Sequence, residues 1–155
     1  MPTDLWRFAQ SLYARPGVAS ACLRLQDGGA DVCLLLCGAW LERRGLDCTA
    51  PRLQQLLALA VPWQEQVIMP LRRLRQAWRT AAGGDPELDR LREQVKALEL
   101  DAERQLLLRL ESLVQAWPEQ PSQNESGPWL ERLAPAGEAA CRDALQLLRA
   151  AADSA

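Results

Sequence analysis

The chain of 155 residues contains no histidine. This absence excludes Ser-His-Asp and Cys-His nucleophile systems, histidine-ligated zinc and the commonest general base of enzymes. Glycine-rich phosphate loops such as GxxxxGKS or GxGxxG are also missing, so the sequence does not support nucleotide binding through a loop of this kind. We therefore assign no catalytic residue and favour a protein that is not an enzyme.

Residues typical of sheets are scarce, because valine, isoleucine and threonine together number only 10. Leucine and alanine, which form helices well, make up about a third of the chain. The length suits one domain, since most domains contain about 100 to 200 residues. The sequence therefore predicts an all-α fold, with residues 1–155 forming a single-domain bundle of about six to eight helices.

Excess positive charge and long apolar runs are missing as well. The formal net charge is −2, so we expect no nucleic-acid partner. The longest strongly apolar run, residues 32–41, has about half the length of a membrane-spanning helix, so we expect no membrane span. The five cysteines cannot all pair within one chain, and the first residues do not resemble a secretory signal. We therefore expect reduced thiols and a cytoplasmic location.

Capping residues and prolines indicate where the helices begin and end. Thr3 and Asp31 are expected to cap the first and third helices, and either Thr49 or Asp47 the fourth. The third helix is the most apolar and is expected to form the centre of the core. The fourth helix is expected to stop near Pro62, and Pro70 to kink the helix that follows.

Residues 63–116 form a candidate helical hairpin with its turn at 83–85, where two glycines precede an Asp-Pro helix start. Apolar residues recur every three or four positions, and the arms carry opposite net charges, +3 over residues 62–82 and −3 over residues 83–116. A second apolar stripe appears only in the C-terminal half of the second arm. We therefore expect an antiparallel hairpin that protrudes from the core.

Several short segments of the chain carry a resemblance to a known family. The segments are Leu5-Trp6, Phe8-Ala9, Tyr13, Pro16-Gly17-Val18, Ala21-Cys22-Leu23, Leu25-Gln26-Asp27, Asp31-Val32, Leu34-Leu35-Leu36, Trp40, Trp63, Val67, Pro70-Leu71-Arg72, Arg75 and Glu99-Leu100-Asp101-Ala102-Glu103. Over about residues 4–110 they resemble domain of unknown function 2390, a small family of uncharacterised proteobacterial proteins. The family pattern usually has asparagine where this chain has Cys33. The resemblance implies a short bacterial cytoplasmic protein and brings no activity or catalytic residues with it.

Six charged residues are candidates for binding a ligand. Two carboxylates flank a flexible turn, two more lie four residues apart on one helix, and two arginines belong to a basic strip: Asp27, Asp31, Glu99, Glu103, Arg72 and Arg75. Such a set suits an anionic, diphosphate-like and partly apolar ligand, held directly or through Mg²⁺. The alternative is structural, with the aspartates acting as cap and turn former and the glutamates pairing with helix arginines.

Trp117 and Trp129 flank residues 117–128, whose prolines, serines and glycine predict a surface loop. These tryptophans either anchor a partner or pack the loop against the core. Beyond the loop we expect a short helix and a final helix that begins at Pro135. Cys33 and Cys37 share a helix face as a metal site would require, but their leucine neighbours favour buried core residues.

Two functions remain open at this point. The leading hypothesis is a non-enzymatic interaction or regulatory module that binds an unknown protein partner or a second copy of itself, without a cofactor. It would use the hairpin tip at Gly83 and Gly84 or the loop between Trp117 and Trp129. The alternative is a small-molecule-binding protein or enzyme that uses the six charged residues, with Mg²⁺ as its only cofactor. The two differ in whether those side chains converge on an open pocket.

Overall fold

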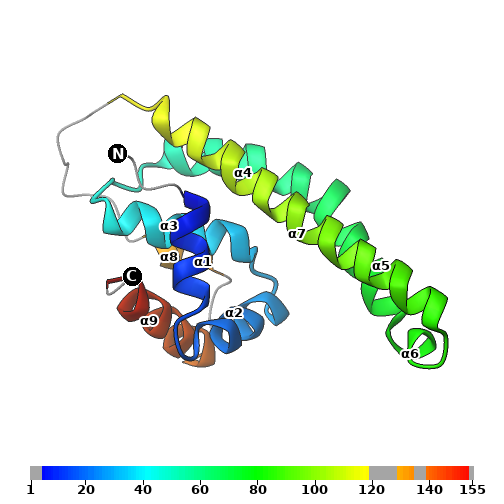
Figure 1. Cartoon of the computed structure of the whole chain (residues 1–155). Helices are drawn as coiled ribbons and strands as arrows, with labels where there is room; N and C mark the ends of the chain where they lie inside the picture. The colour runs from blue at the N-terminus through cyan, green and yellow to red at the C-terminus, as the bar shows by residue number, and fades with distance from the viewer. Residues whose placement is uncertain (1–4, 119–128, 135–138, 154–155) are drawn as a thin grey trace.

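The computed structural model describes residues 5–118, 129–134 and 139–153, and all regular structure within these ranges is helical (Figure 1). This confirms the all-α prediction. In chain order the elements are α1 (Leu5–Tyr13), α2 (Val18–Asp27), α3 (Val32–Arg43), α4 (Ala50–Trp63), the π-helical turn η1 (Gln64–Ile68), α5 (Met69–Ala77), α6 (Arg79–Ala82), α7 (Pro86–Gln115), α8 (Trp129–Leu133) and α9 (Ala139–Asp153).

Helix α3 lies at the centre of the core, as its composition predicts. Every residue from Cys33 to Leu41 is buried, and α3 contacts α1, α2, α7, α8 and α9. Gly38 allows the close approach of α8, because a Cβ atom there would lie only 2.8 Å from Leu133 Cδ1. Trp40 is 1% exposed, so its indole is part of this core.

Side-chain caps begin three of the helices where the sequence places them. Asp31 Oδ1 accepts hydrogen bonds from the backbone N–H groups of Cys33 and Leu34. Thr49 and Asp85 accept equivalent bonds at the starts of α4 and α7. Each cap satisfies N–H groups that have no partner within the helix. The cap predicted at Thr3, the loop residues 119–128 and the helix start at Pro135 lie outside the described residues.

Helix α4 ends at Trp63, one residue after Pro62, as the sequence predicts. Pro70 lies in the first turn of α5 and not inside the following helix, where the sequence predicts that it causes a kink. The backbone continues from α4 into the π-helical turn, and α5 begins at Met69. A proline ring clashes with the carbonyl four residues earlier in an α-helix. For Pro70 that carbonyl belongs to Gln66 in η1, where the wider π-turn relieves the clash.

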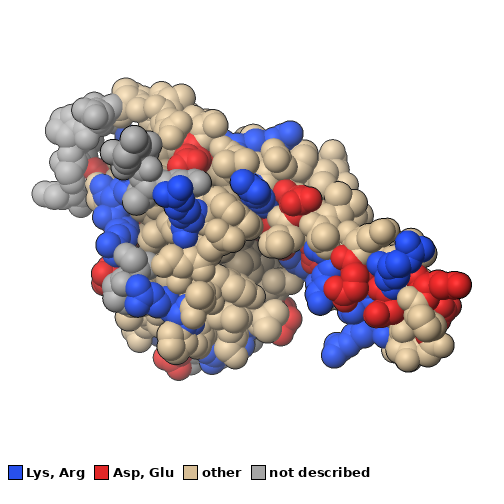
Figure 2. All heavy atoms as spheres, in the orientation of Figure 1, with Lys and Arg blue, Asp and Glu red and all other residues tan. Residues whose placement is uncertain are grey.

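Helices α5 and α6 pack antiparallel against the N-terminal half of α7, and residues 83–85 join the two arms. Figure 1 shows this pair at the end of the molecule opposite α8 and α9. Helix α5 has no buried residue, and the buried residues of α7 begin only at Glu99. Figure 2 shows side chains of both charge signs gathered over this end. No helix in the described ranges is both long enough and apolar enough to cross a membrane.

Candidate functional site

Two adjoining hollows lie between the α1–α3 layer and the helices η1, α5 and α7. The larger has a volume of about 470 Å³ and the smaller about 260 Å³. Gln26, Gln64 and Arg72 line both, so the hollows meet at these three side chains. Together the two hollows form the candidate site.

The larger hollow is mainly apolar. Its buried wall comes from α1, α2, α3 and α7 and includes Ala9, Cys22, Cys33, Leu36 and Leu107. Its rim carries large apolar side chains that remain open to solvent, namely Tyr13, Leu23 and Leu100, which are 44%, 55% and 54% exposed. An apolar molecule that entered would cover both the wall and this rim.

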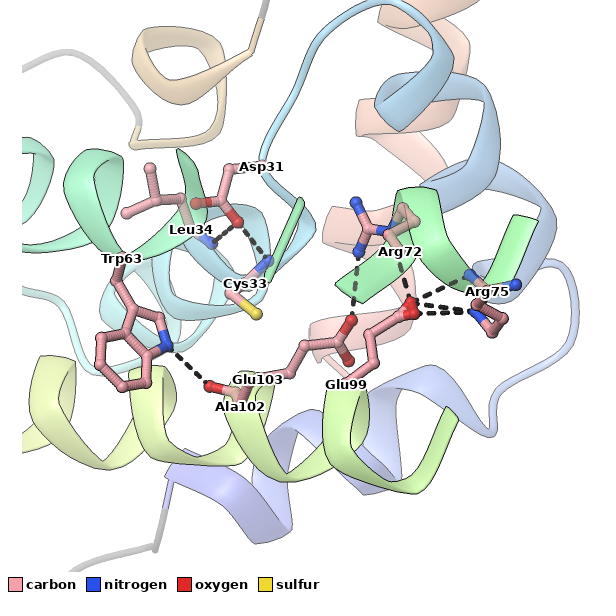
Figure 3. Close-up of polar contacts among 9 residues, drawn as sticks. All are labelled: Asp31, Cys33, Leu34, Trp63, Arg72, Arg75, Glu99, Ala102 and Glu103. Carbon is pink, nitrogen blue, oxygen red and sulfur yellow. Dashed lines mark hydrogen bonds and ion pairs between the residues drawn. The ribbon is translucent and has the colours of Figure 1, made fainter. Parts of the chain in front are cut away.

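A cluster of ion pairs joins α5 to α7 (Figure 3), and two of its members, Arg72 and Glu103, line the larger hollow. Arg75 and Glu99 line neither hollow. Arg72 Nη2 donates to Glu103 Oε1 at 3.1 Å, and Arg72 Nε lies 3.5 Å from Glu99 Oε1. With its amide oxygen turned towards the guanidinium, Gln26 accepts from Arg72 Nη1 at 2.9 Å. Arg75 binds both oxygens of Glu99 at 2.9 Å, from Nη2 to Oε1 and from Nε to Oε2. Both guanidinium groups are therefore engaged by groups of the protein itself.

Asp31 lies at the smaller hollow with only one of its two carboxylate oxygens engaged. Oδ1 caps α3, whereas Oδ2 is buried and has no hydrogen-bond partner. Burial raises the pKa of Asp31 to about 6, although two backbone hydrogen bonds and Arg72 act in the opposite direction. Burial likewise raises the pKa of Glu103, against the influence of Arg72. Burial therefore disfavours the charged forms of both carboxyl groups.

Gln64 reaches the site from the π-helical turn. Its side chain lines both hollows, and its amide oxygen Oε1 is buried without a partner. The neighbouring Trp63 fixes this segment to α7, because its indole N–H donates to the carbonyl of Ala102 at 2.9 Å. Arg109 stacks on the same ring at 4.0 Å. Unpaired buried oxygens are rare in folded proteins, and two of them belong to this site.

The structure brings together five of the six charged candidates. Arg72, Arg75, Glu99 and Glu103 form the ion-pair cluster, and Asp31 lies at the adjoining hollow. Asp27 is exposed and lines neither hollow. Within the described ranges, no three histidine, cysteine, aspartate or glutamate side chains are grouped so that they could hold a metal ion.

Trp129 is buried, so it does not serve as an exposed anchor. It is 1% exposed, and its indole N–H donates to the Leu46 carbonyl at 2.7 Å. Trp117 stacks against it with ring centroids 6.0 Å apart and donates to Gln55. The guanidinium carbon of Arg52, a residue that is 8% exposed, lies over the Trp117 ring at 5.0 Å from its centroid. These contacts attach the end of α7 to α4 and α8.

Cys33 and Cys37 are buried core residues, as their leucine neighbours predict. Both are free thiols, and Cys33 also lines the larger hollow. Burial raises the pKa of Cys33 and, to about 11, that of Cys22 on α2, which also lines the larger hollow. The thiols of the wall are therefore protonated near neutral pH and behave as small apolar groups.

The sequence analysis missed Gln26 and Gln64 as site residues. Gln64 is placed by a π-turn, and its only sequence signal is the pair of prolines, Pro62 and Pro70, on either side. Such turns are rare and are found frequently at functional sites. The role of Gln26 depends on its contact with Arg72 of α5, which no local sequence pattern indicates.

A family model described as protein of unknown function (DUF2390) matches residues 4–110. The chain belongs to this family. In the DUF2390 chain the matched segment contains every residue that lines the two hollows, and it ends before Trp117. The comparisons with curated proteins and with solved structures found no match.

Proposed function

We propose that the protein binds a small, partly apolar organic molecule in the two adjoining hollows. The observation that carries this proposal is the apolar hollow of about 470 Å³ that opens at Gln26, Gln64 and Arg72 into a polar one of about 260 Å³. Ligand sites of proteins have volumes of roughly 300–1,000 Å³, with apolar walls and a few convergent polar groups. The larger hollow would take the apolar body of the ligand, and the smaller one its polar end.

The ion-pair cluster supports a binding role without Mg²⁺. Glu99 has both oxygens occupied by Arg75, and Glu103 binds Arg72. A cation that used these carboxylates as ligands would have to displace two arginines. We therefore propose that the protein binds its ligand directly, without a Mg²⁺ ion between the ligand and the carboxylates. The free thiols among the described cysteines support a reducing, cytoplasmic setting.

A series of linear primary alcohols would test this function by calorimetry. We expect affinity to rise with chain length, because each added methylene buries more apolar surface. Ala14 is exposed and lines the larger hollow, so Ala14→Phe should narrow the entrance and weaken binding. The matched control is Ala97→Phe, at an exposed position of α7 that lines neither hollow. Equal binding by both variants, or no binding of any alcohol, would contradict the proposal.

A second candidate function, binding of a second copy of the chain by the hairpin, is favoured by a separate observation. Leu91 and Leu98 are 42% and 54% exposed, and their separation of seven residues places them on one face of α7. Leu100 and Glu103, which line the larger hollow, lie on a different face. The first arm of the hairpin carries exposed arginines at Arg73 and Arg79, and α7 carries exposed acids at Glu87, Asp89 and Glu93, so two antiparallel copies would have complementary charges.

Sedimentation analysis would test this second candidate. We expect a concentration-dependent dimer that Leu98→Glu abolishes, because a charge would replace a buried apolar contact. Ala97→Glu, one position away on the same helix, is the control and should leave the dimer intact. A monomer at every concentration would rule out self-association through this face.

A further inference from the structure

The guanidinium groups of the site are occupied, which bears on what the polar end of a ligand can be. All three side-chain nitrogens of Arg72 have partners, in Glu99, Glu103 and Gln26. Arg75 is bound to Glu99 through Nε and Nη2. An anionic ligand would have to compete with these internal carboxylates for either arginine. The cluster therefore does not offer a prepared anion site.

The polar groups that lack partners are hydrogen-bond acceptors. Asp31 Oδ2 and Gln64 Oε1 are both buried and unpaired, and both residues line the smaller hollow. A buried acceptor without a donor is costly, so a donor supplied by a ligand would gain more there than at the surface. The ligand end that complements these atoms therefore donates hydrogen bonds.

The charge of the site has the sign that complements a cation. Asp31, Glu99 and Glu103 outnumber Arg72 and Arg75 by one. Arg73 also lines the smaller hollow, but it is exposed, and solvent screens its charge. The excess carboxylate charge lies deeper than this arginine, next to the unpaired oxygens.

We infer that the site takes a molecule with an apolar body and a protonated primary amine, whose N–H groups bind Asp31 and Gln64 beside Glu103. This inference rests on the proposed small-molecule function and specifies its ligand class. A primary ammonium carries three donors and a single positive charge in a compact group. It satisfies both unpaired oxygens at once and neutralises the excess carboxylate charge. The structure thus favours a cationic ligand over the anionic one expected from the sequence.

Three ligands with the same body and different ends would test the inference: octylammonium, 1-octanol and octanoate. We expect octylammonium to bind at least about tenfold more tightly than 1-octanol, since a charged hydrogen bond replaces a neutral one, and octanoate to bind most weakly. Tighter or equal binding of octanoate would overturn the inference, and Arg73→Ala would then show whether that arginine holds the anion. If none of the three binds in a manner sensitive to Ala14→Phe, the proposed function itself fails.

Variants of the unpaired oxygens separate recognition of the amine from general apolar binding. Asp31→Asn removes the charge and keeps a side chain that caps helices well, so the preference for octylammonium over octanol should fall to within about threefold. Gln64→Leu tests the second oxygen without changing any charge and should reduce the same preference. Asp27→Asn is the matched control, because Asp27 is exposed and lines neither hollow. An unchanged preference in both Asp31→Asn and Gln64→Leu would contradict the inference.

Proton release provides a readout that apolar binding does not change. Asp31 lies near Arg72, Glu103, Cys33 and Cys37, and a bound cation would add positive charge and lower its pKa from about 6. Calorimetry at pH 6 in buffers of different ionisation enthalpy should therefore detect proton release with octylammonium and none with 1-octanol. The release should be lost in Asp31→Asn. Equal release with both ligands would count against contact between the amine and Asp31.

Discussion

Helices α3 and α5 represent two regions of the molecule that are stabilised in different ways. In α3, nine consecutive residues are buried and the helix contacts five others. In α5 no residue is buried, and it is held by ion pairs to α7, by a hydrogen bond from Arg92 Nε to the Arg75 carbonyl and by the partly buried Leu71. Apolar burial stabilises the region around α3, whereas directed polar contacts orient the hairpin. The proposed ligand site lies where the two regions meet.

The largest effect that we expect from a single substitution is in the α3 region. Trp40→Ala removes a side chain that is 1% exposed, and we expect a loss of about 3–5 kcal/mol of unfolding free energy in urea melts. Trp40→Phe should cost clearly less, because it keeps most of the volume and removes an indole N–H that is buried without a partner. A loss below about 1 kcal/mol for Trp40→Ala would show that apolar burial is not what stabilises the α3 region.

In the hairpin, the largest effect is expected at the ion pairs. Glu99→Gln keeps the shape of the side chain but leaves Arg75 without its charged partner. We expect a loss of about 2 kcal/mol, less than for a fully buried pair because Arg75 is 24% exposed. The control is Glu93→Gln, whose exposed pair with Lys96 is 3.8 Å long and should contribute at most a few tenths of a kcal/mol. Equal losses in the two variants would contradict a polar origin for the orientation of α5.

At the boundary between the regions, the expected effect on stability depends on pH. The pKa of Asp31 is about 6 in the folded protein, above its ordinary value of 3.8, so the folded state binds this proton more tightly than the unfolded state. Proton binding by Asp31 therefore stabilises the folded state fully below about pH 4, and this stabilisation is lost as pH rises through about 6. Asp31→Asn should therefore be more stable than the natural protein at pH 8 in urea melts, and this gain should vanish towards pH 4. A gain that does not depend on pH would rule out the buried charge as its cause.

The smallest effect is expected at the hairpin tip. Removing one turn from each arm between Trp78 and Leu91 deletes a segment in which Ala82 is the buried residue. We expect the unfolding free energy to change by less than about 1 kcal/mol, with binding of 1-octanol retained. Unfolding of the shortened protein would show that the tip contributes to the core.

Features that depend on neighbouring residues were predictable from the sequence. The caps at Asp31, Thr49 and Asp85 follow from residue type and position. The burial of the C-terminal half of α7, and not of its N-terminal half, follows from the second apolar stripe in that half. The character of the site was not predictable, because it depends on which partners meet in space. The sequence leaves open whether Arg72 and Arg75 hold an anion or pair with Glu99 and Glu103, and the structure shows the ion pairs. The unpaired oxygen of Gln64 depends on the π-turn, which neither proline alone indicates.

The π-turn between α4 and α5 has a consequence for how insertions and deletions act on this family. An α-helix rotates by about 100° per residue, and a π-turn accommodates roughly one additional residue without lengthening the turn. It thus lets Leu56 and Ala60 of α4 face the core while Arg72 and Arg75 face α7. Loss of one residue between Gln64 and Ile68 would restore a regular helix and rotate one of these faces away from its partner. The π-turn therefore sets how far the α5 face at the site is rotated relative to the α4 face in the core. This rotation depends more on the number of residues in the turn than on their identity.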